Sequence, residues 1–168
     1  MLKQNLVEKN QMKTISHTQS SFATNKKKEA LEKFKAIPMP KEREEDWRYT
    51  NIEKLKLENF EPFESENTIN ATSLSEDLIE KGVILTDINT AFEKYPVAKE
   101  YFLRNVRTDK DKFIALNVSH FNNGVFLYVP KNVELEEPIR VSFNFDGQAS
   151  VLHNLVVVDS NSKVSVIE

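Results

Sequence analysis

The sequence predicts an α+β fold in which a mainly helical region leads into a series of short β-strands. Before about residue 112, apolar side chains recur at helical spacing between capping residues. After it, short apolar runs begin about every 12 to 14 residues, with turn-forming residues between them. The chain has 168 residues, which is enough for one well-buried core.

The first expected helix begins at Thr24. Ala30 and Phe34 lie on one face of it, Lys and Glu cover the other, and Pro38 ends it. The apolar stripe is narrow, so this helix should be peripheral. The polar, lysine-rich residues 1–23 are predicted to form a mobile tail.

The middle of the chain alternates between loop and helix signals. The polar residues 64–72 are the best linker candidate. Ser73 and Glu76 have the spacing of a capping box, and Gly82 stands where a helix would end. A short strand should follow at 83–85.

Two further short helices are expected after that strand. Asp87 or Asn89 can cap the first, which carries Ala91 and Phe92, and Pro96 can open the second. Proline suits this position because its missing N–H has no partner in the first helical turn.

Five strand-like runs follow, and they are bounded by Asn, Gly, Pro and Asp turns. Such spacing fits a sandwich, a barrel or a β-solenoid. The last run ends at Glu168 without a capping element, which favours a solenoid that is truncated here and exposes an apolar end. The runs are Phe113–Val118, Val125–Val129, Ile139–Phe145, Val151–Val158 and Val164–Ile167.

No catalytic or metal-binding pattern can be named in this sequence. It contains no cysteine, which excludes thiolate-held clusters, and His17, His120 and His153 lack the spacing of metal ligands. With three glycines it has neither a P-loop nor a dinucleotide-binding turn. Its apolar runs are far shorter than the roughly 20 residues of a membrane helix. A binding or scaffold role is therefore expected.

Charge is unevenly distributed along the chain. Residues 1–50 carry eleven Lys/Arg against seven Asp/Glu, and the remainder carries twelve against nineteen. The aromatic residues are not interleaved with the basic ones, so no nucleic-acid partner is expected. Trp47, beside Arg48 and Tyr49, is interpreted as an aromatic anchor rather than a ligand-stacking site.

Four stretches, in this order, together resemble the SufB/SufD family of iron–sulfur cluster assembly proteins. The absence of a cysteine-containing stretch near Val133–Ile139 favours the SufD branch. The stretches are Pro38 to Thr50 with its Trp-Arg-Tyr-Thr quartet, Gly82 to Tyr101, Lys112 to Pro130 with Asn117 and Gly124, and Asn154 to Glu168.

The resemblance implies a non-catalytic, cytoplasmic scaffold subunit. Its fold would be a helical region (24–111) followed by the first coils of a right-handed parallel β-helix (112–168), truncated at the C-terminus. Its partners would be SufB-like and SufC-like proteins. No cofactor is expected in this chain, because the iron–sulfur cluster and ATP belong to the parent complex. The signature positions, interpreted as structural, are Trp47, Arg48, Tyr49, Asn117, Gly124 and Pro130.

Two other functions remain open from the residues alone. One is a carbohydrate-binding β-solenoid, although Trp47 lies outside the strand region where an aromatic platform would be needed. The other is a basic interaction module, whose binding would weaken steeply with salt. For the truncated β-helix, the exposed apolar end should favour homodimers.

Overall fold

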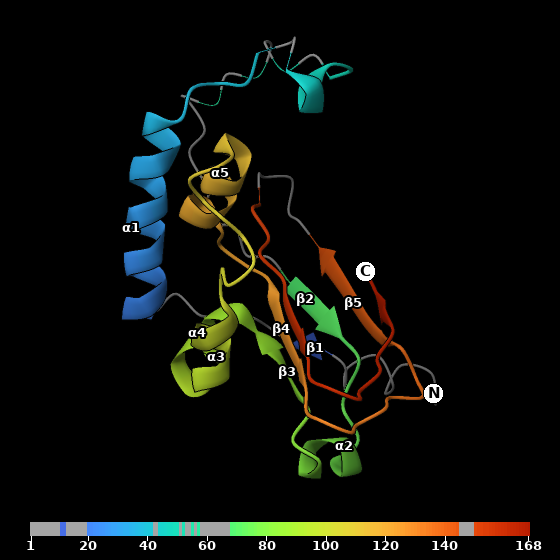
Figure 1. The fold of residues 1–168 in the computed structure, drawn as a ribbon. Helices are drawn as coiled ribbons and strands as arrows, with labels where there is room; N and C mark the ends of the chain where they lie inside the picture. The colour runs from blue at the N-terminus through green and yellow to red at the C-terminus, as the bar shows by residue number, and fades with distance from the viewer. Residues whose placement is uncertain are drawn as a thin grey trace.

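The computed structural model is a mixed α+β arrangement of two small sheets and several helices (Figure 1). It describes residues 11–12, 20–41, 44–50, 52, 55, 57, 68–144 and 150–168. The helical elements are α1 (Ser21–Ala36), the 3-10 turn η2 (Glu45–Trp47), α2 (Glu76–Glu80), α3 (Ile88–Lys94), α4 (Pro96–Tyr101) and α5 (Lys112–His120). The strands are β1 (Gln11–Met12), β2 (Thr68–Ala71), β3 (Ile84–Asp87), β4 (Val125–Val129), β5 (Ile139–Asn144), β6 (Leu155–Val158) and β7 (Val166–Ile167).

Helix α1 begins three residues before the predicted start, because Ser20 caps it. The hydroxyl of Ser20 accepts a hydrogen bond from the backbone N–H of Ala23. Ala23, Ala30 and Phe34 are buried on one face, and the helix packs along α5 at the edge of the molecule (Figure 1). The expectation of a peripheral helix is confirmed.

Helix α5 corrects the prediction of a strand at Phe113–Val118. The Asp111 carboxylate accepts hydrogen bonds from the N–H groups of Phe113 and Ile114, at 2.7 and 2.9 Å, and so caps the helix. Ala115 and Val118 are the buried residues of this helix. A short apolar run fits both the alternation of a strand and the spacing of a helix, and here capping by Asp111 and packing on α1 favour the helix.

The predicted linker at 64–72 is also wrong where the structure describes it. Thr68–Ala71 form β2, which pairs antiparallel with β1 on one side and with β5 on the other. Ile69 and Ala71 are buried while Thr68 and Asn70 are only partly covered, which is the alternation of a strand. Pairing on both sides places this strand inside the first sheet, although it lies in a stretch rich in polar residues.

The helices between residues 75 and 101 were predicted largely correctly from local signals. Helix α2 is capped by Ser75 rather than by Ser73, since the Ser75 hydroxyl accepts from the N–H of Leu78. Gly82 follows it at φ +86°, a conformation that favours glycine. Asp87 caps α3 and Pro96 opens α4, as expected.

The strands of the described residues form two sheets. The first has the order β1-β2-β5-β7 and the second the order β3-β4-β6. In each sheet the last pair is parallel: β4 with β6, and β5 with β7. The other pairs are antiparallel.

The parallel pairs arise because two stretches of the chain run side by side in the same direction. They are residues 123–140, called the first turn, and residues 152–167, called the second turn. Residues 123–134 of the first turn pair with residues 29 positions further along, from Asn123–Leu152 through Phe126–Leu155 to Glu134–Lys163. Side chains continue the stack at the corner, where the Asn161 Nδ2 donates to the Asn132 Oδ1 at 2.8 Å. Both asparagines have positive φ, so the two turns share one corner geometry.

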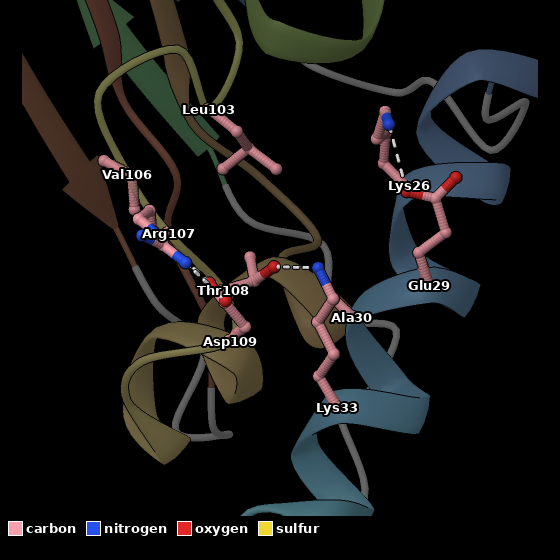
Figure 2. A pocket seen from close by; sticks show the side chains of 9 residues that line it. All are labelled: Lys26, Glu29, Ala30, Lys33, Leu103, Val106, Arg107, Thr108 and Asp109. Carbon is pink, nitrogen blue, oxygen red and sulfur yellow. Dashed lines mark hydrogen bonds and ion pairs between the residues drawn. The ribbon is translucent and has the colours of Figure 1, made fainter.

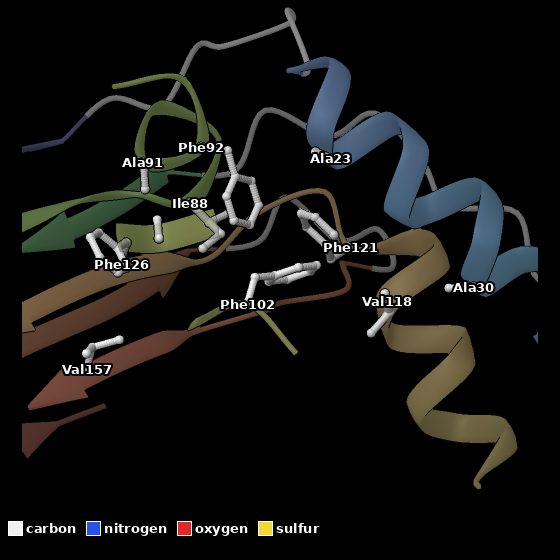
Figure 3. Packing of buried hydrophobic residues seen from close by; sticks show 11 residues of the cluster. Ala23, Ala30, Ile88, Ala91, Phe92, Phe102, Val118, Phe121, Phe126 and Val157 are labelled. Atoms are coloured by element: carbon white, nitrogen blue, oxygen red, sulfur yellow. The ribbon is translucent and has the colours of Figure 1, made fainter. Parts of the chain in front are cut away.

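Two apolar clusters hold this arrangement together. One lies between the helices and the β3-β4-β6 sheet and contains Phe92, Phe102, Phe121 and Phe126 (Figure 3). The other fills the space between the sheets, with Ile69 and Val141 from one sheet and Leu127 from the other among its members. Strand β4 contributes to both clusters, which is why it is almost fully buried.

Candidate functional site

The side chain of Asn117 joins the helices to the second turn of the chain. It stands on α5, and its Nδ2 donates to the backbone carbonyl of Leu152 at 2.7 Å. Its Oδ1 lies 2.7 Å from the Nδ1 of His153. An amide oxygen can only accept, so Nδ1 of His153 carries the proton. One amide thus fixes both a backbone carbonyl and an imidazole tautomer.

His153 lies in an apolar environment beside this amide. The rings of Phe102 and Phe121 are centred 4.9 and 5.4 Å from the imidazole. Burial lowers the pKa of His153 to about 4, because the charged form would lose its hydration here. The imidazole is therefore neutral at physiological pH and acts as part of the packing.

Gly124 lies against the same residue. Its φ is +148°, and a Cβ placed there would overlap the backbone carbonyl of His153. On either side of this contact, His153 N–H donates to the Asn123 carbonyl and Val125 N–H donates to the Asn154 side chain, at 2.9 and 3.0 Å. Only glycine lets the two turns approach this closely.

Pro130 meets the second turn at the far end of β4. Its carbonyl accepts a hydrogen bond from the Ser162 hydroxyl, and that hydroxyl oxygen accepts one from the Val133 N–H. Asn117, Gly124 and Pro130 thus all contact the second turn, and the first two converge on His153.

The Trp-Arg-Tyr signature lies elsewhere, and its Trp47 contacts α5. The Trp47 ring is half-buried, with its centroid 4.9 Å from that of Phe113. Arg48 and Tyr49 are exposed and contact each other, through a hydrogen bond of 2.7 Å and through the guanidinium over the ring. Tyr49 is 88% exposed, so it holds nothing in place within the described part of the chain.

A pocket of about 260 Å³ lies between α1 and the segment 103–109 (Figure 2). Its charged groups have partners: Lys26 pairs with Glu29, Arg107 with Asp109, and Lys33 donates to Thr108 at 2.7 Å. The hydrogen bond and charge of Arg107 hold the pKa of Asp109 down at about 2. These pairings fix the segment to α1 and leave no base or nucleophile poised in the pocket.

Lys27 is a partly buried cation on α1. Its Nζ lies 4.3 Å from the centroid of the Phe121 ring. That ring packs on His153, beside the contacts among Asn117, Gly124 and His153 that we call the junction. Burial lowers the pKa of the Lys27 amine to about 8. Sequence reasoning did not single out Lys27 or the Asn117–His153 pair. No local signal marks a contact between residues 36 positions apart.

The described residues contain no group of three or more His, Cys, Asp or Glu side chains that could hold a metal ion. Of the three histidines, His120 packs edge-on against Phe34, His153 forms the junction above, and His17 lies outside the described residues. No helix in the described residues is long and apolar enough to span a bilayer.

Comparison with known proteins now identifies the class. The family model for the SufBD protein N-terminal region matches residues 4–73 and 65–141. The chain therefore belongs to the SufB/SufD family of iron–sulfur cluster assembly proteins.

Individual relatives indicate the branch. The iron–sulfur cluster assembly protein SufD of Bacillus subtilis is 31% identical over 96% of this chain. SufBD family proteins of Staphylococcus haemolyticus and Staphylococcus aureus are 34% and 33% identical over 57% of it. The match to SufD over nearly the whole chain places it on the SufD branch. The chain spans 45% of the length of the Bacillus protein and 21% of the length of the staphylococcal proteins.

Proposed function

We propose that this chain serves as a non-catalytic scaffold segment in iron–sulfur cluster assembly. The observation that carries the proposal is the junction itself: the signature residues Asn117, Gly124 and Pro130 all hold one turn of chain on another. Their roles are structural in this reading. Residues that hold backbone together, and expose no acid, base or nucleophile, suit a rigid support for partner proteins.

The stacked turns are the beginning of a right-handed parallel β-helix in this proposal. The spacing of 29 residues between the pairs from Asn123 to Glu134, the parallel pairs and the matched corner at Asn132 and Asn161 support it. Further turns would cover β6 and β7, whose outer edges carry the exposed side chains of Val156, Val158, Val166 and Ile167. When uncovered, the same edges would favour a homodimer.

The proposed partners are a SufB-like protein and a SufC-like ATPase, in a cytoplasmic complex. Neither a cluster nor ATP is assigned to this chain. Both are handled by the parent complex, and the cluster is its product rather than a resident cofactor.

Co-expression with the SufB-like and SufC-like proteins of the same host tests this function. Complexes would be detected by size-exclusion chromatography with light scattering. A stable complex with the SufB-like protein, lost on replacing Val156 and Ile167 by lysine, supports the proposal. Failure to bind both by this chain and by the full gene product that contains it would refute it.

A further inference from the structure

A groove of about 500 Å³ lies between α2 and the corner that joins β4 to β5. Figure 1 shows α2 at the end of the molecule away from α5. Leu74 and Leu78 form its apolar floor, and both rest on the core between the sheets. The opposite wall is the segment 134–137. The groove is therefore built from two segments about 60 residues apart in sequence, both held by the same core.

The wall of this groove results from a mismatch between the two turns. Glu134 pairs with Lys163, and the next pair is Ile139 with Val166. Four residues of the first turn, 135–138, thus lie opposite two of the second. The first turn therefore has two more residues here than the second, and Glu136 and Glu137 lie at the exposed surface. The pairing of the two turns does not use these two side chains.

The charge of the groove is strongly one-sided. Four carboxylates line it against one ammonium group. Asp77 and Lys81 neutralise each other at 2.7 Å. Within the described residues, Glu134, Glu136 and Glu137 form no ion pair, and Lys163, whose backbone pairs with Glu134, does not reach its carboxylate.

From the apolar floor and the unpaired acidic wall we infer that this groove docks a basic, amphipathic segment of a partner protein. The leucines of the floor would take its apolar side chains, and Glu134, Glu136 and Glu137 its Lys or Arg side chains. Charge complementarity selects this occupant, because an acidic segment would be repelled and a wholly polar one would leave the floor uncovered. None of the residues that line the groove belongs to β6 or β7, although Ile139 at its end pairs with Val166 of β7.

Fluorescence anisotropy with three labelled peptides of equal length tests this inference. One alternates lysine with leucine, one lysine with serine, and one glutamate with leucine. The lysine–leucine peptide should bind this chain at least about tenfold more tightly than the other two, a difference of about 1.4 kcal/mol. Its affinity should fall as salt is raised, because the ion pairs lie at the surface.

Two triple variants assign the binding to the groove. E134Q/E136Q/E137Q should weaken binding of the lysine–leucine peptide about tenfold, since three exposed pairs each contribute little alone. The control E32Q/E93Q/E100Q changes the net charge equally at exposed sites elsewhere and should alter binding less than about twofold. Circular dichroism melts establish that both variants fold.

The outcomes separate cleanly. Equal weakening by both triple variants would show non-specific charge attraction and overturn the inference. Tight binding of the glutamate–leucine or lysine–serine peptide, or no binding of the lysine–leucine peptide, would overturn it as well. Self-association that is abolished by E134Q/E136Q/E137Q, without peptide binding, would show a second copy as the occupant and equally refute a basic partner.

Discussion

Replacing Gly124 by alanine tests whether close contact between the two turns stabilises the fold. A side chain at φ +148° costs about 1–3 kcal/mol by itself. Its Cβ would also displace the carbonyl of His153, which is backbone and cannot rotate away. Two adjacent hydrogen bonds, worth about 1 kcal/mol each, would be strained with it. We expect a loss of about 3–5 kcal/mol of unfolding free energy.

Gly82 provides a matched control. It also has a positive φ, +86°, but a Cβ there would meet only the Pro130 ring at an ordinary 3.4 Å. Gly82→Ala should therefore cost only the backbone term, about 1–2 kcal/mol. Urea unfolding followed by Trp47 fluorescence and far-UV circular dichroism measures both variants. Equal losses in the two variants would refute the argument that inter-turn contact, rather than backbone strain, makes Gly124 necessary.

Three further perturbations follow from the structure. Burial lowers the pKa of His153 to about 4, whereas the imidazole of the unfolded chain takes up a proton at about pH 6.5. The contribution of the neutral, buried imidazole to the unfolding free energy should therefore be fully present above about pH 6.5 and fall by up to about 3 kcal/mol toward pH 4. His153→Gln should remove that part of the slope in pH-dependent urea unfolding, and an unchanged slope would contradict a buried neutral imidazole. Asp111→Ala should cost about 1–2 kcal/mol, with Asp111→Asn largely restoring it; thermal melts in which asparagine is as damaging as alanine would rule out capping as the cause. Val156→Lys should abolish concentration-dependent dimerisation in light scattering, and a wild-type chain that is monomeric at every concentration would disprove association through this edge.

Local signals in the sequence were sufficient to predict several elements of the fold. Strand β4 matches the predicted Val125–Val129 run, and Asp87 and Pro96 open their helices as expected. These positions carry a cap, a fixed φ or an apolar run bounded by turn residues. Each of these acts within a few residues of its own position, so sequence reasoning can find it.

Elements that depend on distant partners could not be predicted in this way. Strand β2 lies in the polar stretch 64–72, and its partner β5 is about 70 residues away in the sequence. The run at 113–118 is apolar enough for a strand, and contact with α1 favours the helix. The Asn117–His153 contact likewise follows only from the stacking of one turn on the other.

The spacing of 29 residues that residues 123–134 keep to the positions stacked on them also limits how such a sequence can change its length over evolution. A single deletion between residues 123 and 134 would shift each later side chain by one place and turn inward-facing residues outward. The corner at 135–138 already holds two residues more than the segment stacked against it, without disturbing the pairs on either side. Insertions and deletions should therefore accumulate at corners of this kind, while the strands between them keep a fixed length.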